Sequence, residues 1–439
     1  MNQVGLYYLS TRPMSAQELE ARIGKISAEI ELQKEVLKKL ELSKMLVQRQ
    51  LNAVRDPVAR LPLEISSEIF IQSLSLAHPE LGSQNIPMLL LNVCNAWANI
   101  AISTPRLWAA IHIDFPRAES FKQGLETWLR RAGNCPLSIS LSGTFDPGVG
   151  RIIWRHVHRL KHLEIDLEED PEPDNGSTIE ILAGTSPGLL PFLETLVIHG
   201  STNPNGSWGY SGPQILELLR LAPNLVECMI DVDTVFDLPG TLEQLALPCL
   251  RRLTFGDFYA DDDIFKWLAL PNLQTLHLSM QDVQDNDLLE FLQRSSPPLQ
   301  DLVMGRGCRH VLFNRLEESL HLVPTLTQLE LVGPRDHLME QLLSSLAESP
   351  SHILPNLCRL TFHYLDPPYI SSSVGSPTFW ATVLGALSVR HNQLTFFKFL
   401  HPVDWPFEPE AEVYAALRRL AVEGMEIYIG TEEQNVLSV

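Results

Sequence analysis

The stretch Pro271-Asn-Leu-Gln-Thr-Leu-His-Leu278 carries the pattern that decides the fold of most of this chain. Its leucines follow the proline in the order Leu-x-x-Leu-x-Leu, and the last two alternate with a polar residue. Such alternation is typical of a β-strand with one buried face. Because the same arrangement recurs along the chain, we expect a repeat architecture.

Nine copies of this arrangement begin between residues 158 and 392, and seven of the nine origins are prolines. The spacing between origins varies from 23 residues, between Pro248 and Pro271, to 37 residues, between Pro355 and Asn392. Unequal loops on a common scaffold explain this variation. The apolar triplets are Leu160/Leu163/Ile165, Leu193/Leu196/Ile198, Leu225/Cys228/Ile230, Leu250/Leu253/Phe255, Leu273/Leu276/Leu278, Leu299/Leu302/Met304, Leu326/Leu329/Leu331, Leu357/Leu360/Phe362 and Leu394/Phe397/Phe399.

Amphipathic segments between the strands predict helices at 215–221, 264–268, 288–292, 338–346 and 379–387. Alternation of strand and helix requires parallel strands, so we predict an α/β fold. Residues 108–113 and 136–141 are expected to supply the first strands, joined by a helix at 121–131.

With this alternation, residues 109–439 resemble a leucine-rich-repeat horseshoe. That family usually has Asn or Cys three residues after the last leucine of a repeat, and this chain has other residues there. The resemblance therefore implies an irregular, less curved solenoid without an asparagine ladder at the bends.

Side chains between the leucines point to the concave face of such a solenoid. They form a mixed polar surface that suits protein recognition, and ordinary solvated surface is the alternative for each residue. The candidate target-binding residues are Arg252, Thr254, His277, Glu330, Arg359, His363 and Tyr364.

Residues 15–55 predict a long amphipathic helix that begins with a capping box at Ser15-Ala-Gln-Glu18. From 19 to 54, apolar residues recur at alternating steps of four and three, the a/d spacing of a coiled coil, with Gln33 and Lys44 as polar interruptions. The seam predicts a homodimer. The alternatives are that the same seam folds back onto its own chain or lies against the next domain, or that the segment is a lone solvated helix.

Residues 56–108 predict a small all-α module. Leu-Pro-x-Glu-Ile at 61–65, Ile-Phe at 69–70, Val-Cys-x-x-Trp at 93–97 and Leu-Trp at 107–108 are similar to the F-box, a helical module that docks onto the Skp-type adaptor of cullin-based SCF ubiquitin ligases. A helical cap over the open end of the repeats is the alternative. The resemblance implies adaptor binding by Leu61, Pro62, Ile65, Ile69 and Phe70. Of these, Ile65, Ile69 and Phe70 are expected to lie partly in the core and partly at the contact, and Trp97 is expected to pack in the core.

The composition is that of an ordinary globular protein, with 439 residues, 45% hydrophobic and 20% charged. A net charge of −20 argues against binding nucleic acid through phosphates and against an anionic membrane surface. The six cysteines form no C-x-x-C pair, and no stretch has the roughly 18 apolar residues of a membrane span. A reducing compartment, cytoplasm or nucleus, is expected, and residues 1–14 are expected to be a disordered tail.

The sequence contains no recognisable catalytic signature. Three histidines at 156, 158 and 162 stand near Glu164 and Asp166, but their spacing does not match a helical zinc pair. We therefore expect no metal, no cofactor and no enzymatic activity. The leading hypothesis is a substrate-recognition adaptor of an SCF-type ubiquitin ligase, and the alternative is a non-ligase scaffold that uses the solenoid and the coiled coil.

Overall fold

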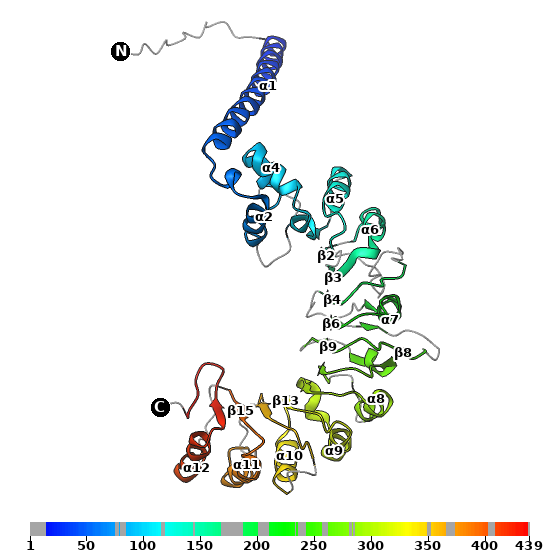
Figure 1. Cartoon of the computed structure of the whole chain (residues 1–439), viewed down its shortest axis with the longest axis vertical. Helices are drawn as coiled ribbons and strands as arrows, with labels where there is room; N and C mark the ends of the chain where they lie inside the picture. The colour runs from blue at the N-terminus through cyan, green and yellow to red at the C-terminus, as the bar shows by residue number, and fades with distance from the viewer. Residues whose placement is uncertain are drawn as a thin grey trace. The chain divides into compact units, whose positions relative to one another are not determined.

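The protein has a mixed α/β fold with a long N-terminal helix and a mostly parallel sheet (Figure 1). It divides into two compact units: unit 1 contains Met1–Ser75 and Gly82–Leu107, and unit 2 contains Leu76–Leu81 and Trp108–Val439. The tail expected at 1–14 lies outside the described residues. The computed structural model describes residues 15–74, 79, 85–115, 119–143, 145–167, 188–200, 210–232, 234–235, 243–256, 262–280, 283, 286–348, 353–365, 374–402 and 409–437.

Unit 1 begins with the predicted long helix, α1 (Ala16–Arg55). The capping box is present: the Glu18 amide donates to the Ser15 hydroxyl at 3.3 Å, and the Ser15 amide donates to the Glu18 carboxylate at 2.9 Å. Asp56 is the C-cap, because the proline that follows it disfavours a helical conformation at this residue.

The rest of unit 1 consists of short elements. Residues 90–102 form two helices rather than one, because Cys94 is extended and caps the second one. Its sulfur accepts a hydrogen bond from the Trp97 amide at 3.5 Å. The elements are η1 (Val58–Arg60), α2 (Leu63–Gln72), α3 (Leu90–Val93), α4 (Asn95–Ile102) and η2 (Pro105–Trp108), whose last residue belongs to unit 2.

Unit 2 is built on a twelve-stranded sheet in which strands follow one another in chain order and each neighbouring pair is parallel. The nine strands predicted from the triplets and the two strands expected before them are confirmed. The last strand, β16, has no counterpart among the predicted ones. The strands are β1 (Ala110–Asp114), β2 (Leu137–Ser142), β3 (Leu160–Leu167), β4 (Thr195–Gly200), β6 (Glu227–Asp231), β9 (Arg252–Phe255), β11 (Thr275–Leu278), β12 (Asp301–Met304), β13 (Gln328–Val332), β14 (Arg359–His363), β15 (Phe396–Leu400) and β16 (Glu426–Gly430).

The register aligns the apolar positions of successive repeats into columns. Leu276 pairs with Leu253 on one side and with Leu302 on the other, and all three side chains are fully buried. Full burial of a Leu contributes roughly 1.5–3 kcal/mol, so such columns supply much of the core. Strand β16 continues the columns with Ile427 and Ile429.

Helices lie along one side of this sheet (Figure 1). The helix predicted at 264–268 is a 3-10 helix rather than an α-helix, η4 (Asp262–Trp267), and β10 (Leu268–Ala269) then pairs with β8 (Leu245–Ala246). The repeat from Pro248 to Pro271 is too short for a longer connection. The helices are α5 (Glu119–Arg131), α6 (Pro147–Trp154), α7 (Gly212–Leu221), α8 (Asp287–Ser295), α9 (Phe313–His321), α10 (Asp336–Glu348), α11 (Pro377–Arg390) and α12 (Ala411–Val422), and the remaining short elements are η3 (Val157–Arg159), η5 (Arg306–His310) and the paired strands β5 (Tyr210–Ser211) and β7 (Thr234–Val235).

Buried arginines satisfy carbonyl groups at the ends of neighbouring elements. Arg390, the last residue of α11, is 2% exposed and donates to the carbonyls of Leu346 at 3.0 Å, Ile353 at 2.7 Å and Leu354 at 2.8 Å. The first of these lies in the last turn of α10, where carbonyls lack helical partners. The guanidinium therefore joins two helices and the turn before β14.

Candidate functional site

Unit 1 presents an apolar surface on and beside α2. Leu61, Ile65 and Ile69 follow one another at steps of four residues and are between 42% and 51% exposed, and we call them the α2 apolar surface. Aliphatic side chains that cluster on a surface in this way mark sites where proteins bind one another. All three are among the residues for which the F-box resemblance implies adaptor contact, and Pro62, which is exposed, is a fourth.

The opposite side of α2 packs into unit 1. Phe70 is 2% exposed and its ring lies 5.0 Å from that of Trp97. Of the two roles expected for Phe70, the structure therefore shows the core role, and the expected adaptor contact is corrected. Ser66, one turn earlier, is fully buried and donates to the carbonyls of Val58 and Pro62, each at 3.2 Å. This anchoring explains why Ile65 and Ile69, one position before each buried residue, remain exposed.

Asp56 connects α1 to this packing. Its carboxylate accepts hydrogen bonds from the Trp97 indole nitrogen and from the Val58 amide, the latter at 2.9 Å. One carboxylate thereby holds the end of α1, the start of η1 and the helix α4. The orientation of the α2 apolar surface depends on this junction, because η1 leads directly into α2.

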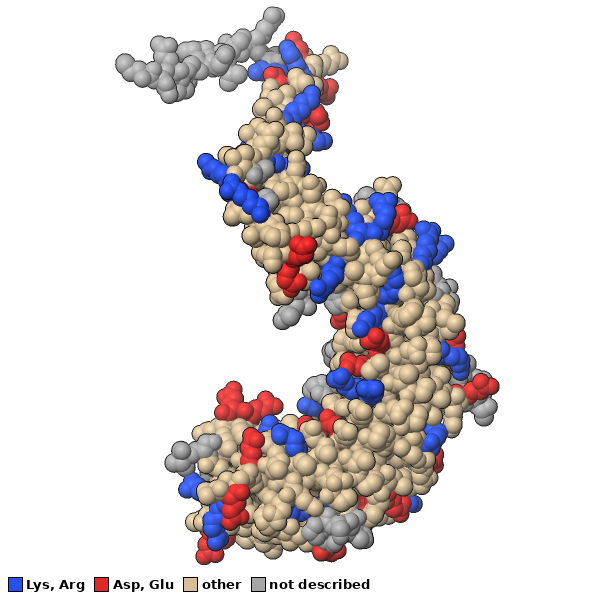
Figure 2. All heavy atoms as spheres, in the orientation of Figure 1, with Lys and Arg blue, Asp and Glu red and all other residues tan. Residues whose placement is uncertain are grey.

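Unit 2 has a polar sheet face, formed by the strand residues that alternate with the buried columns. Lys, Arg, Asp and Glu are interspersed along the visible side of unit 2 rather than gathered by sign (Figure 2). Aligned side chains on this face include Glu164, Glu227, Arg252, Thr254, Thr275, His277, Asp301, Gln328, Glu330, Arg359, Thr361 and Lys398.

A cluster on this face surrounds Glu330, in a hollow of about 270 Å³. His363 on β14 lies 2.9 Å from the Glu330 carboxylate, and Arg359 stacks over the ring of Phe396 at 3.7 Å. The hydrogen bond from His363 lowers the pKa of Glu330, the charges of His363 and His277 act in the same direction, and partial burial opposes them. The hollow thus offers an ionised carboxylate, a cation and an aromatic ring.

Two other predicted residues on this face are engaged by neighbouring strands. Arg252 lies 2.5 Å from Glu227, and His277 lies 3.7 Å from Asp301. Thr254, which lies on β9 like Arg252, is half-buried.

Tyr364 is not on this face. It is 3% exposed, and its hydroxyl donates to Asp336 at 3.1 Å. Because side chains alternate along a strand, Tyr364 continues the inward series of Leu360 and Phe362. The expectation that it contacts a target is therefore wrong.

His199 is a polar-face residue that the candidate set omitted. It lies between Glu164, at 3.9 Å, and Asp231, at 3.8 Å, from the two neighbouring strands. The sequence signal was available, since His199 follows the inward Ile198 and must point outward.

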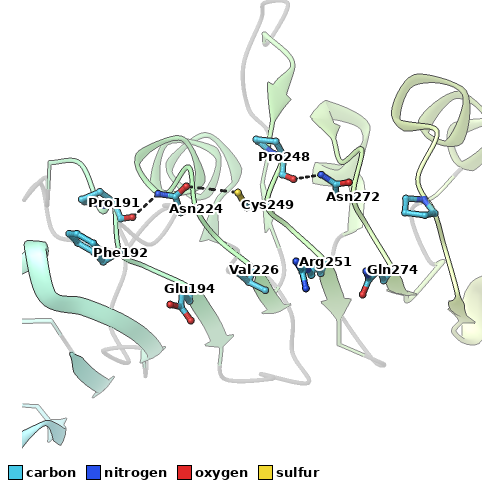
Figure 3. A pocket seen from close by; sticks show the side chains of 11 residues that line it. Pro191, Phe192, Glu194, Asn224, Val226, Pro248, Cys249, Arg251, Asn272 and Gln274 are labelled. Atoms are coloured by element: carbon cyan, nitrogen blue, oxygen red, sulfur yellow. Dashed lines mark hydrogen bonds between the residues drawn. The ribbon is translucent and has the colours of Figure 1, made fainter. Parts of the chain in front are cut away.

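A second hollow, of about 590 Å³, crosses the starts of β4, β6, β9 and β11 (Figure 3). Phe192, which is 59% exposed, forms part of its wall with several prolines. Asn224 donates to the carbonyl of Pro191 at 2.8 Å, and Asn272 donates to that of Pro248 at 2.7 Å. The lining residues are Pro191, Phe192, Glu194, Asn224, Val226, Pro248, Cys249, Arg251, Asn272, Gln274 and Pro298.

These asparagines stand directly behind the repeat prolines, as does Asn356, which donates to the Pro324 carbonyl at 2.9 Å. Each joins the proline turn of one repeat to that of the preceding repeat. The asparagines that make these hydrogen bonds directly follow the proline of a repeat. In leucine-rich-repeat proteins, by contrast, the usual asparagine comes three residues after the last leucine. The signal was the recurring Pro-Asn-Leu at 223–225, 271–273 and 355–357.

Among the described residues, no three His, Cys, Asp or Glu side chains are grouped so that they could hold a metal ion. Within the same residues, no helix combines the length and apolar character needed to cross a bilayer. Comparison with protein families and with curated proteins found no match for this chain.

Proposed function

We propose that this chain is the substrate-recognition subunit of an SCF-type cullin ubiquitin ligase. Unit 1 acts as an F-box-like module that binds a Skp-type adaptor, and unit 2 acts as an irregular leucine-rich-repeat solenoid that binds a protein target. The observation that carries this proposal is the α2 apolar surface, because it coincides with the segment that resembles the adaptor contact of the F-box.

The adaptor contact has the character of a protein interface. Exposed Leu and Ile side chains lose their contact with water when a partner covers them, which favours binding. The buried side of α2, held by Ser66 and Phe70, fixes the helix so that little ordering is required on binding.

Unit 2 supplies the target contact through its polar sheet face. Strands that pair with their neighbours in chain order favour a solenoid, in which an extended surface is available for a partner. The chain itself transfers no ubiquitin. It raises the effective concentration of a target lysine near the charged enzyme, which the catalytic subunits of the ligase provide.

Binding to the adaptor tests the proposal. Immobilised full-length chain should retain purified Skp-type adaptor, and Ile65→Glu with Ile69→Glu should weaken retention at least about tenfold, since two charges enter an apolar contact. Val422→Glu is the matched control, because Val422 is 88% exposed and lies in α12 of unit 2. Circular dichroism of each variant checks that the fold is kept.

If the wild-type chain does not retain the adaptor, or if the double variant binds as well as the control, the ligase proposal is lost. The alternative is then a non-ligase scaffold that assembles partners through the repeats and the N-terminal helix. The exposed apolar seam of α1 favours this alternative, because such a seam needs a partner helix.

A further inference from the structure

The apolar seam of α1 is exposed along its whole length. Nine seam side chains are between 41% and 74% exposed, namely Leu19, Ile23, Ile26, Ile30, Leu37, Leu40, Val47, Leu51 and Val54. They occupy the a and d positions of consecutive heptads, with Gln33 at a d position and Lys44 at an a position. A helix with such a seam requires a second helix to cover it.

Two hydrogen bonds that tie α1 to its own unit lie on the other side of the helix. Arg49 donates to the carbonyl of Leu91, and Asn52 donates to that of Val93 at 3.1 Å. In the heptad these two residues occupy f and b positions, which face away from the a/d seam. Apolar residues outside the seam at 42–46 share that side. The attachment of α1 to unit 1 therefore leaves the seam accessible.

We infer that α1 pairs with α1 of a second copy of this chain in antiparallel orientation, in the register where facing seam positions have numbers that sum to 77. An a position of one copy then meets a d position of the other. Gln33 meets Lys44 of the second copy, so the two polar seam residues share a layer. The other layers are wholly apolar: Ile23 with Val54, Ile26 with Leu51, Ile30 with Val47 and Leu37 with Leu40.

The flanking charges fit the same register. In an antiparallel pair, e positions face e positions, which places Glu20 opposite Arg55 and Lys34 opposite Glu41 of the second copy. Each pair occurs twice by symmetry, so four opposite-charge contacts form. A shift by one heptad places Lys34 opposite Lys34 instead and separates the two polar seam residues. Charge and seam therefore select the same register.

A parallel pair fits less well. It keeps one attraction, between Glu29 and Lys34, but it places Lys44 against Lys44 within the seam and Gln33 against Gln33. Two ammonium groups in an apolar layer repel one another and lose their solvation. The antiparallel pair avoids this contact because the seam lysine meets a neutral amide.

The orientation has a consequence for the assembly that does not depend on whether the adaptor binds. The rest of unit 1 is attached at the C-terminal end of α1, near Arg55. In the inferred antiparallel register, Arg55 of one copy lies level with residue 22 of the other. The points where α1 joins the rest of unit 1 in the two copies are therefore about 50 Å apart along the helix axis. A parallel pair would bring them together.

Cysteine cross-linking of the full-length chain tests the orientation. Ile30→Cys and Val47→Cys face one another only in the antiparallel pair, so mixing the two variants under oxidation should yield cross-linked dimers between them. In a parallel pair, each variant links only to itself, so the mixture yields no cross-links between the two variants. Wild-type chain treated in the same way reports any contribution of the native cysteines, and light scattering of the wild type should give the mass of a dimer.

A charge exchange provides the second readout. Lys34→Glu should weaken dimerisation about tenfold, since two attractions become repulsions, and Lys34→Glu with Glu41→Lys should restore it. In a parallel pair, Lys34→Glu faces Glu29, so the second change would not rescue. A monomeric wild-type chain at tens of micromolar, self-linking of Ile30→Cys in place of mixed linking, or failure of the rescue would each overturn the inference.

Discussion

Replacement of Arg390 by methionine should destabilise the C-terminal part of unit 2. The Arg390 side chain is 2% exposed and donates three hydrogen bonds, of 2.7–3.0 Å, to carbonyls of Leu346, Ile353 and Leu354. Methionine has a similar length and is apolar, so Arg390→Met keeps most of the packing and removes the donors. Burial also lowers the pKa of the guanidinium, which reflects the cost of holding its charge away from water.

The expected loss follows from the carbonyls that remain. A buried acceptor without a donor costs about 1–3 kcal/mol, so three of them cost at least about 3 kcal/mol. Relief of the buried charge offsets part of any larger cost. We therefore expect a loss of about 3 kcal/mol in the free energy of unfolding, concentrated where α10 and α11 meet the turn before β14.

Urea unfolding followed by circular dichroism measures this loss, and amide hydrogen exchange of residues 353–365 locates it. Arg220→Met is the matched control, because Arg220 is exposed and pairs only one turn away with Glu217, at 3.0 Å. Such surface pairs contribute less than about 1 kcal/mol. If Arg390→Met unfolds at the same urea concentration as Arg220→Met, the assigned role of Arg390 is wrong.

Three further outcomes are expected. Leu276→Asp places a carboxylate in the fully buried column and should lower stability by more than about 3 kcal/mol, whereas Thr275→Asp, on the polar face, should cost less than about 1 kcal/mol in the same urea assay. Burial raises the pKa of Cys228 and Cys308 to about 12, so at pH 8 both should react with iodoacetamide about a thousandfold more slowly in the folded chain than in urea. Because the folded-state pKa of Glu330 is lowered, its contribution to stability is present above the unfolded pKa and lost as pH falls; Glu330→Gln should therefore flatten the loss of stability below about pH 5, as measured by melting at successive pH values.

Much of the fold could be predicted because each repeat contains its own local signal. A proline followed by Leu-x-x-Leu-x-Leu predicts the start, direction and inward face of a strand, as Leu253, Leu276 and Leu302 illustrate by pairing side by side. Strand β16 escaped prediction because Gly424, with a φ of 111°, occupies the place of the first leucine of a triplet. The backbone there adopts a conformation that favours glycine, so the expected pattern is interrupted.

The candidate sites were predictable only in part. Alternation placed Glu330 and His363 on the polar face, but the 2.9 Å contact between them depends on the register of β13 against β14, which no local pattern specifies. Tyr364 was assigned to the polar face, although continued alternation would point it inward. The error arose because the sequence does not show whether the alternation of the strand extends as far as residue 364.

The sequence by itself determined the capped N-terminal helix, the heptad seam and the strands of unit 2, since these depend on residues close together in the chain. Tertiary structure alone decided which side of α2 is buried, because Phe70 and Ile69 are equally apolar and only the position of Trp97 separates them. It likewise decided the role of Arg390, which occupies a buried helix position where an apolar residue is the usual choice. Its carbonyl partners are about 36 to 44 residues away in the chain and become neighbours only when α10 and α11 pack together.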